Sequence, residues 1–162
     1  MRFLKLVSAG CLLAVVSTAN AQTPQTEHNV SMGMAIAILL GTLEQCTKDG
    51  KKVSVVVVDK AGVVAASIRG DGTGPHTMET ARLKAYTART RGITSLEFKQ
   101  STASPETAVF RLLPGTIALG GGVPIKMGAE TIGGVGVSGA PKEEEDEACA
   151  KAGIAKVEAA LK

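Results

Sequence analysis

The sequence predicts a single α/β domain in which an antiparallel sheet of about five strands is flanked by helices. Helical patterns lie at residues 32–46 and from residue 143 onward. Between them, residues 52–69 and 116–139 have the β-branched composition and turn residues of β-hairpins. Strands joined by short turns pair antiparallel, so we expect the helices to pack on a sheet built largely from hairpins.

The first 21 residues have the pattern of a secretory signal peptide. Arg2 and Lys5 precede an apolar run at residues 6–16, and a small-residue Ala-Asn-Ala sequence ends at Ala21. We predict cleavage after Ala21, a polar leader at residues 22–29, a domain at residues 30–162, and a periplasmic or secreted protein. A lipoprotein signal ending at Cys11 is the weaker alternative, because its apolar run would be very short. No later segment has the roughly 18 apolar residues of a membrane span.

Removal of the signal peptide leaves 16 basic and 15 acidic residues, so the remaining chain is close to neutral. We therefore expect no general attraction to nucleic acid or to anionic membranes. The aromatic residues that remain are Tyr86, Phe98 and Phe110. A core of Ala and Val buries little area per residue, so we expect a homo-oligomer to supplement it.

The first elements follow from residue spacing. Apolar residues recur at helical spacing from Met32 through Ile36, Leu39 and Leu40 to Cys46, which predicts an amphipathic helix ending near residues 49–50. The β-branched stretches "KVSVVVVD" and "VVAASIR", separated by a short turn, predict a hairpin.

The middle of the chain predicts helices. Thr77 is expected to cap a helix that runs to Gly92. Thr94 and Glu97 have the spacing of a capping box, and Ser104-Pro105 places a capping residue before a proline, so two short helices should follow.

The last third predicts strands and a helix. "TIALGGGVPIKM" and "ETIGGVGVSG", separated by a turn at residues 128–129, have an extended character. Pro141 and the acidic residues 143–147 open a final helix, whose lysines at residues 151, 156 and 162 complement the helix dipole.

Two cysteines remain after the signal peptide is removed. Cys46 and Cys149 could form a disulfide in an oxidising compartment. Two buried free thiols are the alternative, because free cysteine is among the most buried residue types.

The spacing Gly134-x-Gly136-x-x-Gly139 matches a dinucleotide-binding turn. Such a turn belongs in a first strand-turn-helix unit with a second parallel strand after it, whereas a single helix follows here. That helix also begins with acidic residues, which would repel a phosphate. We interpret these glycines as the bare face of a strand that a helix, another subunit or a flat ligand approaches closely.

Four stretches together resemble the GlcG/HbpS family of heme-binding proteins, which is related to the C-terminal domain of PduO-type proteins. They are "VVVVDKAGVVAASIRGDG", "ETARLKAYTA", "LGGGVPIKMG" and "IGGVGVSGAPKEEEDEACAKAG". The resemblance covers about residues 30–160. It implies a profilin-like α/β fold, symmetric oligomers, and binding of heme or a related tetrapyrrole in heme or iron handling or sensing.

A heme needs an axial ligand, for which histidine is the commonest choice. His76 is the preferred candidate, with Arg69, Arg82 and Lys84 as possible partners of the heme propionates. His28 in the leader is the second candidate and Tyr86 a third, although each of these three side chains could equally serve a local structural role.

The acidic run also contains Glu143-x-x-Asp146 and Glu144-x-x-Glu147, pairs that share a helix face and could hold iron loosely. A solvated, dipole-complementing helix start is the favoured interpretation.

Two other functions stay open. The first is a small enzyme that uses Arg69, Asp71, His76 and Glu79 in one cleft to act on an organic acid. The second is an assembly module without ligand chemistry.

Overall fold

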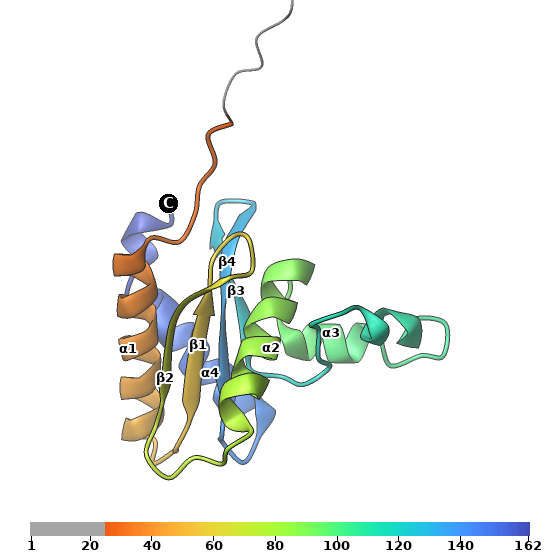
Figure 1. Cartoon of the computed structure of the whole chain (residues 1–162), viewed down its shortest axis with the longest axis horizontal. Coiled ribbons are helices and arrows are strands. Elements are labelled where there is room, and N and C mark those ends of the chain that lie inside the picture. Colours follow the sequence, from red (N-terminus) through yellow and green to blue (C-terminus); the bar gives the residue numbers. More distant parts are fainter. Residues whose placement is uncertain (1–24) are drawn as a thin grey trace, which may run out of the picture.

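The structure, a computed structural model, describes residues 25–162, so the predicted signal peptide and the start of the leader lie outside the described residues. The elements follow one another along the chain as shown in Figure 1. In order they are α1 (Met32–Lys48), β1 (Ser54–Val58), β2 (Val64–Arg69), α2 (Thr77–Arg91), α3 (Ser95–Ser101), η1 (Ala108–Leu112), β3 (Gly122–Met127), β4 (Glu130–Ser138), α4 (Glu143–Ala155) and η2 (Glu158–Ala160).

The four strands form one antiparallel sheet in the order β2-β1-β4-β3. Helices α1 and α4 pack together on one face of this sheet, and α2 packs on the other face, mainly against β4 and β1 (Figure 1). The segment with α3 and η1 extends sideways from the sheet beside α2 (Figure 1). This α/β/α arrangement confirms the predicted fold class. Among the described helices, none is long and apolar enough to cross a membrane.

The sheet has four strands rather than the predicted five. The stretch "TIAL" at residues 116–119 is not a strand, and β3 begins only at Gly122. The reason is a side-chain contact with α2, because the backbone N–H of Ile117 donates to Thr87 Oγ1 at 2.8 Å. The segment therefore runs along a helix instead of joining the sheet.

Several helix boundaries follow the predicted signals. Helix α3 has the expected capping box, with Glu97 N–H donating to Thr94 Oγ1 and Thr94 N–H donating to the Glu97 carboxylate. Helix α2 differs, because His76 occupies the N-cap position and Thr77 is the first helical residue. Thr77 instead donates to the Gly74 carbonyl and hydrogen-bonds Ser54, so it fastens the loop before α2 to β1.

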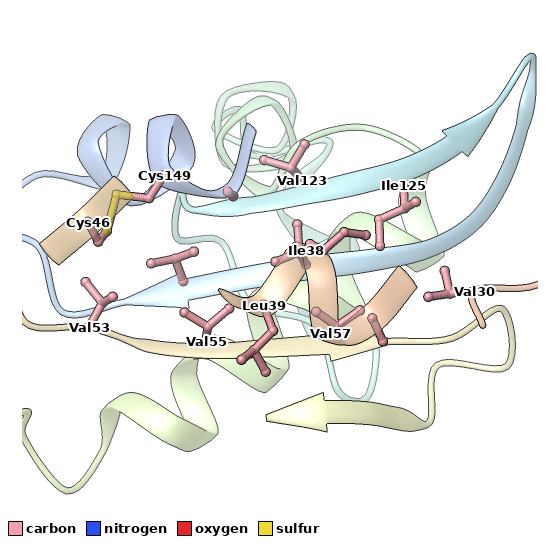
Figure 2. Packing of buried hydrophobic residues seen from close by; sticks show 14 of the residues in the cluster. Val30, Ile38, Leu39, Cys46, Val53, Val55, Val57, Val123, Ile125 and Cys149 are labelled. Carbon is pink, nitrogen blue, oxygen red and sulfur yellow. A yellow bond between two sulfur atoms is a disulfide. The ribbon is translucent and has the colours of Figure 1, made fainter. Parts of the chain in front are cut away.

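The larger core cluster lies between the sheet and the α1–α4 pair (Figure 2). Ile38 and Leu39 of α1 point toward Val55 and Val57 of β1 in this view. The predicted apolar face of α1 was therefore partly wrong, because Met32, Ile36 and Leu40 are 74%, 44% and 53% exposed. Helix α1 thus has apolar residues on two faces, and the sheet covers one of them.

Cys46 of α1 and Cys149 of α4 form the predicted disulfide, with their Cα atoms 5.5 Å apart (Figure 2). Both residues are buried. The bond closes a loop with a sequence separation of 103 residues. In the chain-entropy model, a loop of this size stabilises the folded protein by about 4–5 kcal/mol.

Glycines of β4 allow α2 to approach the sheet closely. A Cβ atom added at Gly136 would overlap the Ala81 carbonyl oxygen of α2, and one at Gly134 would overlap the Ala85 carbonyl oxygen. Helix α2 presents alanine to the sheet, with Ala81 and Ala85 fully buried. Of the three partners that the sequence left open for these glycines, the structure shows a helix.

We predict that Gly136→Ala lowers the free energy of unfolding by about 1–3 kcal/mol or more, because α2 must move away from β4 to admit a methyl group. Gly33→Ala is the matched control, since a Cβ atom there meets nothing within 4 Å. That control should be neutral or stabilise the helix by up to about 1 kcal/mol. Urea denaturation measures both, and equal effects would contradict the packing argument.

Candidate functional site

A cavity of about 290 Å³ lies where β4 ends, between the N-terminal halves of α2 and α4. His76 stands on its rim, and the cavity also contains apolar surface from Leu119, Ala140 and Pro141. The remaining lining residues are Thr80, Lys84, Ser138, Gly139, Glu143 and Asp146. A histidine thus sits beside a small hollow with both apolar and charged walls.

The loop before α2 sets the position of His76. Its imidazole ring packs against Gly74, where an added Cβ atom would lie 2.8 Å from His76 Cε1. The side chain is exposed and makes no capping hydrogen bond to α2. Within the described chain, no group hydrogen-bonds either ring nitrogen, so the imidazole is free to bind a ligand.

The floor of the cavity contains a buried ion pair. Lys84 Nζ of α2 donates to Asp146 Oδ2 of α4 at 2.8 Å and to the Val137 carbonyl of β4 at 2.9 Å. Asp146 Oδ1 accepts from the Ala140 N–H at 3.0 Å. The two side chains are 5% and 3% exposed. Burial raises the pKa of the Asp146 carboxyl, and the neighbouring Lys84 ammonium opposes this shift.

The acidic start of α4 is largely neutralised by lysines. Glu143 pairs with Lys99, and Glu145 with Lys51. The hydrogen bond from Lys51 lowers the pKa of Glu145. The favoured interpretation of a solvated helix start is therefore incomplete, because Asp146 and Glu147 are buried. Among the described residues, no group of three or more His, Cys, Asp and Glu side chains could hold a metal ion.

The structure separates two of the predicted propionate partners, Arg82 and Arg69, from His76, whereas Lys84 lines the same cavity. Arg82 donates to both carboxylate oxygens of Glu79 at 2.7 and 2.8 Å and lines a different cavity of about 270 Å³. Arg69 donates to the Thr73 hydroxyl and carbonyl and lines a third cavity together with Asp71. The predicted cleft that would contain Arg69, Asp71, His76 and Glu79 together is not formed, so this prediction was wrong. Arg69 and Asp71 line one cavity, Glu79 a second and His76 a third.

His28 lies at the opposite end of the sheet. Its Nδ1 atom is 2.9 Å from Glu130 Oε2, at the start of β4, whereas Ser138 beside His76 ends that strand. At about 3.3 Å per residue, the strand separates the two ends by roughly 26 Å. One heme iron cannot bind both histidines of a single chain. Hydrogen bonds from Lys60 and His28 lower the pKa of Glu130.

Tyr86 is half-buried and packs between two glycines. Added Cβ atoms at Gly62 and Gly115 would each contact its ring. It lines a further cavity of about 260 Å³ with Lys60 and Arg89, away from His76. Tyr86 is therefore a packing residue between the two loops that contain these glycines.

Sequence reasoning placed Lys84 near His76 but missed its burial, and it missed Asp146 and Ser138 as members of the same site. Lys84 was expected to reach a heme propionate, yet it lies on the same helix face as Ala81, Ala85 and Ala88, all of which are fully buried. A lysine on a face of alanines is the signal that could have indicated burial.

The fold and the cavity are those of a small single-domain α/β protein, with the exposed His76 beside a hollow where β4 ends. Residues 30–155 match the family model described as "Haem degrading protein HbpS-like". The chain therefore belongs to the HbpS-like family. It is 32% identical over 114 residues to protein GlcG of Escherichia coli strain K12, which covers 70% of this chain and 84% of GlcG.

Solved structures agree with this assignment. The chain resembles the crystal structure of HbpS with a TM-score of 0.79 and 34% identity, over 86% of this chain and 97% of that one. It also resembles the crystal structure of a PduOC:heme complex with a TM-score of 0.70 and 25% identity, over 78% of this chain and 93% of that one.

We predict that Lys84→Met lowers the free energy of unfolding by about 3–5 kcal/mol, because Asp146 would be left buried without its partner. The double variant Lys84→Met/Asp146→Leu should lose much less, since no unpaired charge is then buried. Urea denaturation of the two variants checks this. A double variant less stable than Lys84→Met would show that the pair matters for another reason.

Proposed function

We propose that the protein is a secreted or periplasmic heme-binding protein that acts in heme or iron handling or sensing, with His76 as the axial ligand. The free imidazole of His76 beside a hollow with both apolar and charged walls carries this proposal. The HbpS-like family model and the likeness to a PduOC:heme complex support a tetrapyrrole as the ligand. When bound, the heme supplies an iron atom that the imidazole can coordinate.

The residues around His76 fit one edge of a heme. Leu119, Ala140 and Pro141 offer apolar contact, while the cavity of about 290 Å³ lies at the lower limit of small-molecule sites. The rest of the macrocycle would extend beyond the cavity. Arg82 lines a different cavity, so we propose that it pairs with a propionate only on the part of the macrocycle that extends beyond the hollow, and it would have to exchange its ion pair with Glu79 for this contact.

Export is the second part of the proposal. The Cys46–Cys149 disulfide supports it, because such bonds form and persist in oxidising compartments. The charge, apolar run and small-residue site of the first 21 residues support the same location.

Hemin titration followed by absorbance tests the heme site. We expect a Soret shift that saturates at a defined ratio in the unmodified protein and in His28→Ala, and that weakens at least tenfold or disappears in His76→Ala. The two variants are matched, because both remove an exposed histidine from outside the core.

Loss of the shift in His28→Ala but not in His76→Ala would show that His28 in the leader, and not His76, is the axial ligand. A shift that never saturates in the unmodified protein would refute heme binding altogether.

A homo-oligomer completes the proposal. Met32, Ile36 and Leu40 form an exposed apolar stripe on α1, with no charged residue between residues 32 and 43. An exposed apolar surface is typical of a protein–protein contact, which supports this part of the proposal. A second subunit could also cover the part of the heme that the cavity leaves exposed.

We predict that Ile36→Asp lowers the mass of the assembly, because a buried carboxylate without a partner would disfavour the contact. Thr47→Asp on the same helix adds the same charge at an exposed site outside the stripe and should leave the mass unchanged. Light scattering during size-exclusion chromatography gives both masses. A monomeric unmodified protein would refute the assembly.

A further inference from the structure

The cavity that Arg69 and Asp71 line has a volume of about 370 Å³. It lies at the start of loop 70–76, whereas His76 ends this loop and lines another cavity. It is enclosed by the last turns of α1, the segment entering β1 and the end of β2. It shares no lining residue with the cavity at His76. The heme proposal therefore leaves this cavity without a role.

The cavity has an apolar floor. Leu43, Val53 and Ile68 line it, and Val53 is fully buried while the other two pack against the core. These side chains belong to three different elements, α1, the segment before β1, and β2. A ligand that covers the partly exposed Leu43 and Ile68 gains the burial of their apolar surface.

The rim of the cavity is cationic. It contains Lys51, Lys52 and Arg69, with Asp71 as the acidic residue of the lining. Lys51 is already neutralised by Glu145 at 2.8 Å. Lys52 has no carboxylate within ion-pairing distance in the part of the chain that the structure describes. Lys52 and Arg69 carry two positive charges and Asp71 carries one negative charge, so one further negative charge would balance the rim.

Arg69 is held in place without being neutralised. Its Nε atom donates to Thr73 Oγ1 at 3.2 Å and its Nη2 atom to the Thr73 carbonyl at 2.8 Å. Neither partner carries a charge, so the guanidinium keeps its full attraction for an anion. The two hydrogen bonds that it donates to Thr73 fix its orientation before any ligand arrives.

From this geometry we propose that the cavity binds a monocarboxylate with a short aliphatic tail. The carboxylate lies at Lys52 and Arg69, and the tail covers Leu43 and Ile68. Inorganic phosphate would leave the apolar floor in contact with water, and a neutral alcohol would leave the two cations without a partner. The combination of charge and tail is therefore the chemistry that the site selects.

Titration of the full chain, without added heme, with hexanoate tests the proposal by amide chemical shifts in NMR. We expect saturable shifts at residues 51–53 and 68–71 and none at the His76 cavity. Hexanol and phosphate, which each have one half of the required chemistry, should bind at least about fivefold more weakly. This readout does not involve hemin, so it can fail while the heme proposal stands.

The charge-reversing variant Lys52→Glu should weaken hexanoate binding at least about fivefold. Lys48→Glu is its matched control, because Lys48 is also exposed but lies outside the lining, and its affinity should be unchanged. The proposal is overturned if hexanoate gives no saturable shift, if hexanol binds equally well, or if the two variants behave alike.

Discussion

The contact between α2 and β4 is the constraint on which the rest of the structure depends. Glycine at residues 134 and 136 removes every side-chain atom between the strand and the helix backbone, and alanine on α2 completes the close approach. Because the helix lies so near the sheet, the Lys84 side chain reaches both the Val137 carbonyl of β4 and the Asp146 carboxylate of α4. The position of α2 therefore also sets where His76, at its N-terminus, meets the end of β4.

Much of the fold could be predicted from the sequence because its signals are local. The β-branched runs around the turn at residues 60–62 form β1 and β2, and the Thr94–Glu97 capping box begins α3 as expected. The cysteine count left a Cys46–Cys149 disulfide and two buried free thiols as alternatives, and the structure contains the disulfide. These signals depend on a few neighbouring residues or on composition, so they can be recognised without knowledge of the long-range packing.

Other features depend on tertiary contacts that no local pattern contains. Helical spacing shows that α1 is apolar on the residues from Met32 to Leu43, but it does not say which of its two apolar faces meets the sheet. The segment at residues 116–119 has strand composition and yet runs along α2 through Thr87. The site could not be predicted for the same reason, since Arg69, Asp71 and His76 are close in sequence, yet Arg69 and Asp71 line one cavity and His76 lines another.

The disulfide joins the first helix to the last, which has a consequence for the order of events during synthesis. Cys149 follows all four strands, so the bond cannot form until nearly the whole chain has been made. Helix α1 packs against α4, which is the last of the described α-helices to be synthesised. The first helix must therefore wait for the last before this side of the core closes, and a chain exported while still unfolded would complete both steps only after it has crossed the membrane.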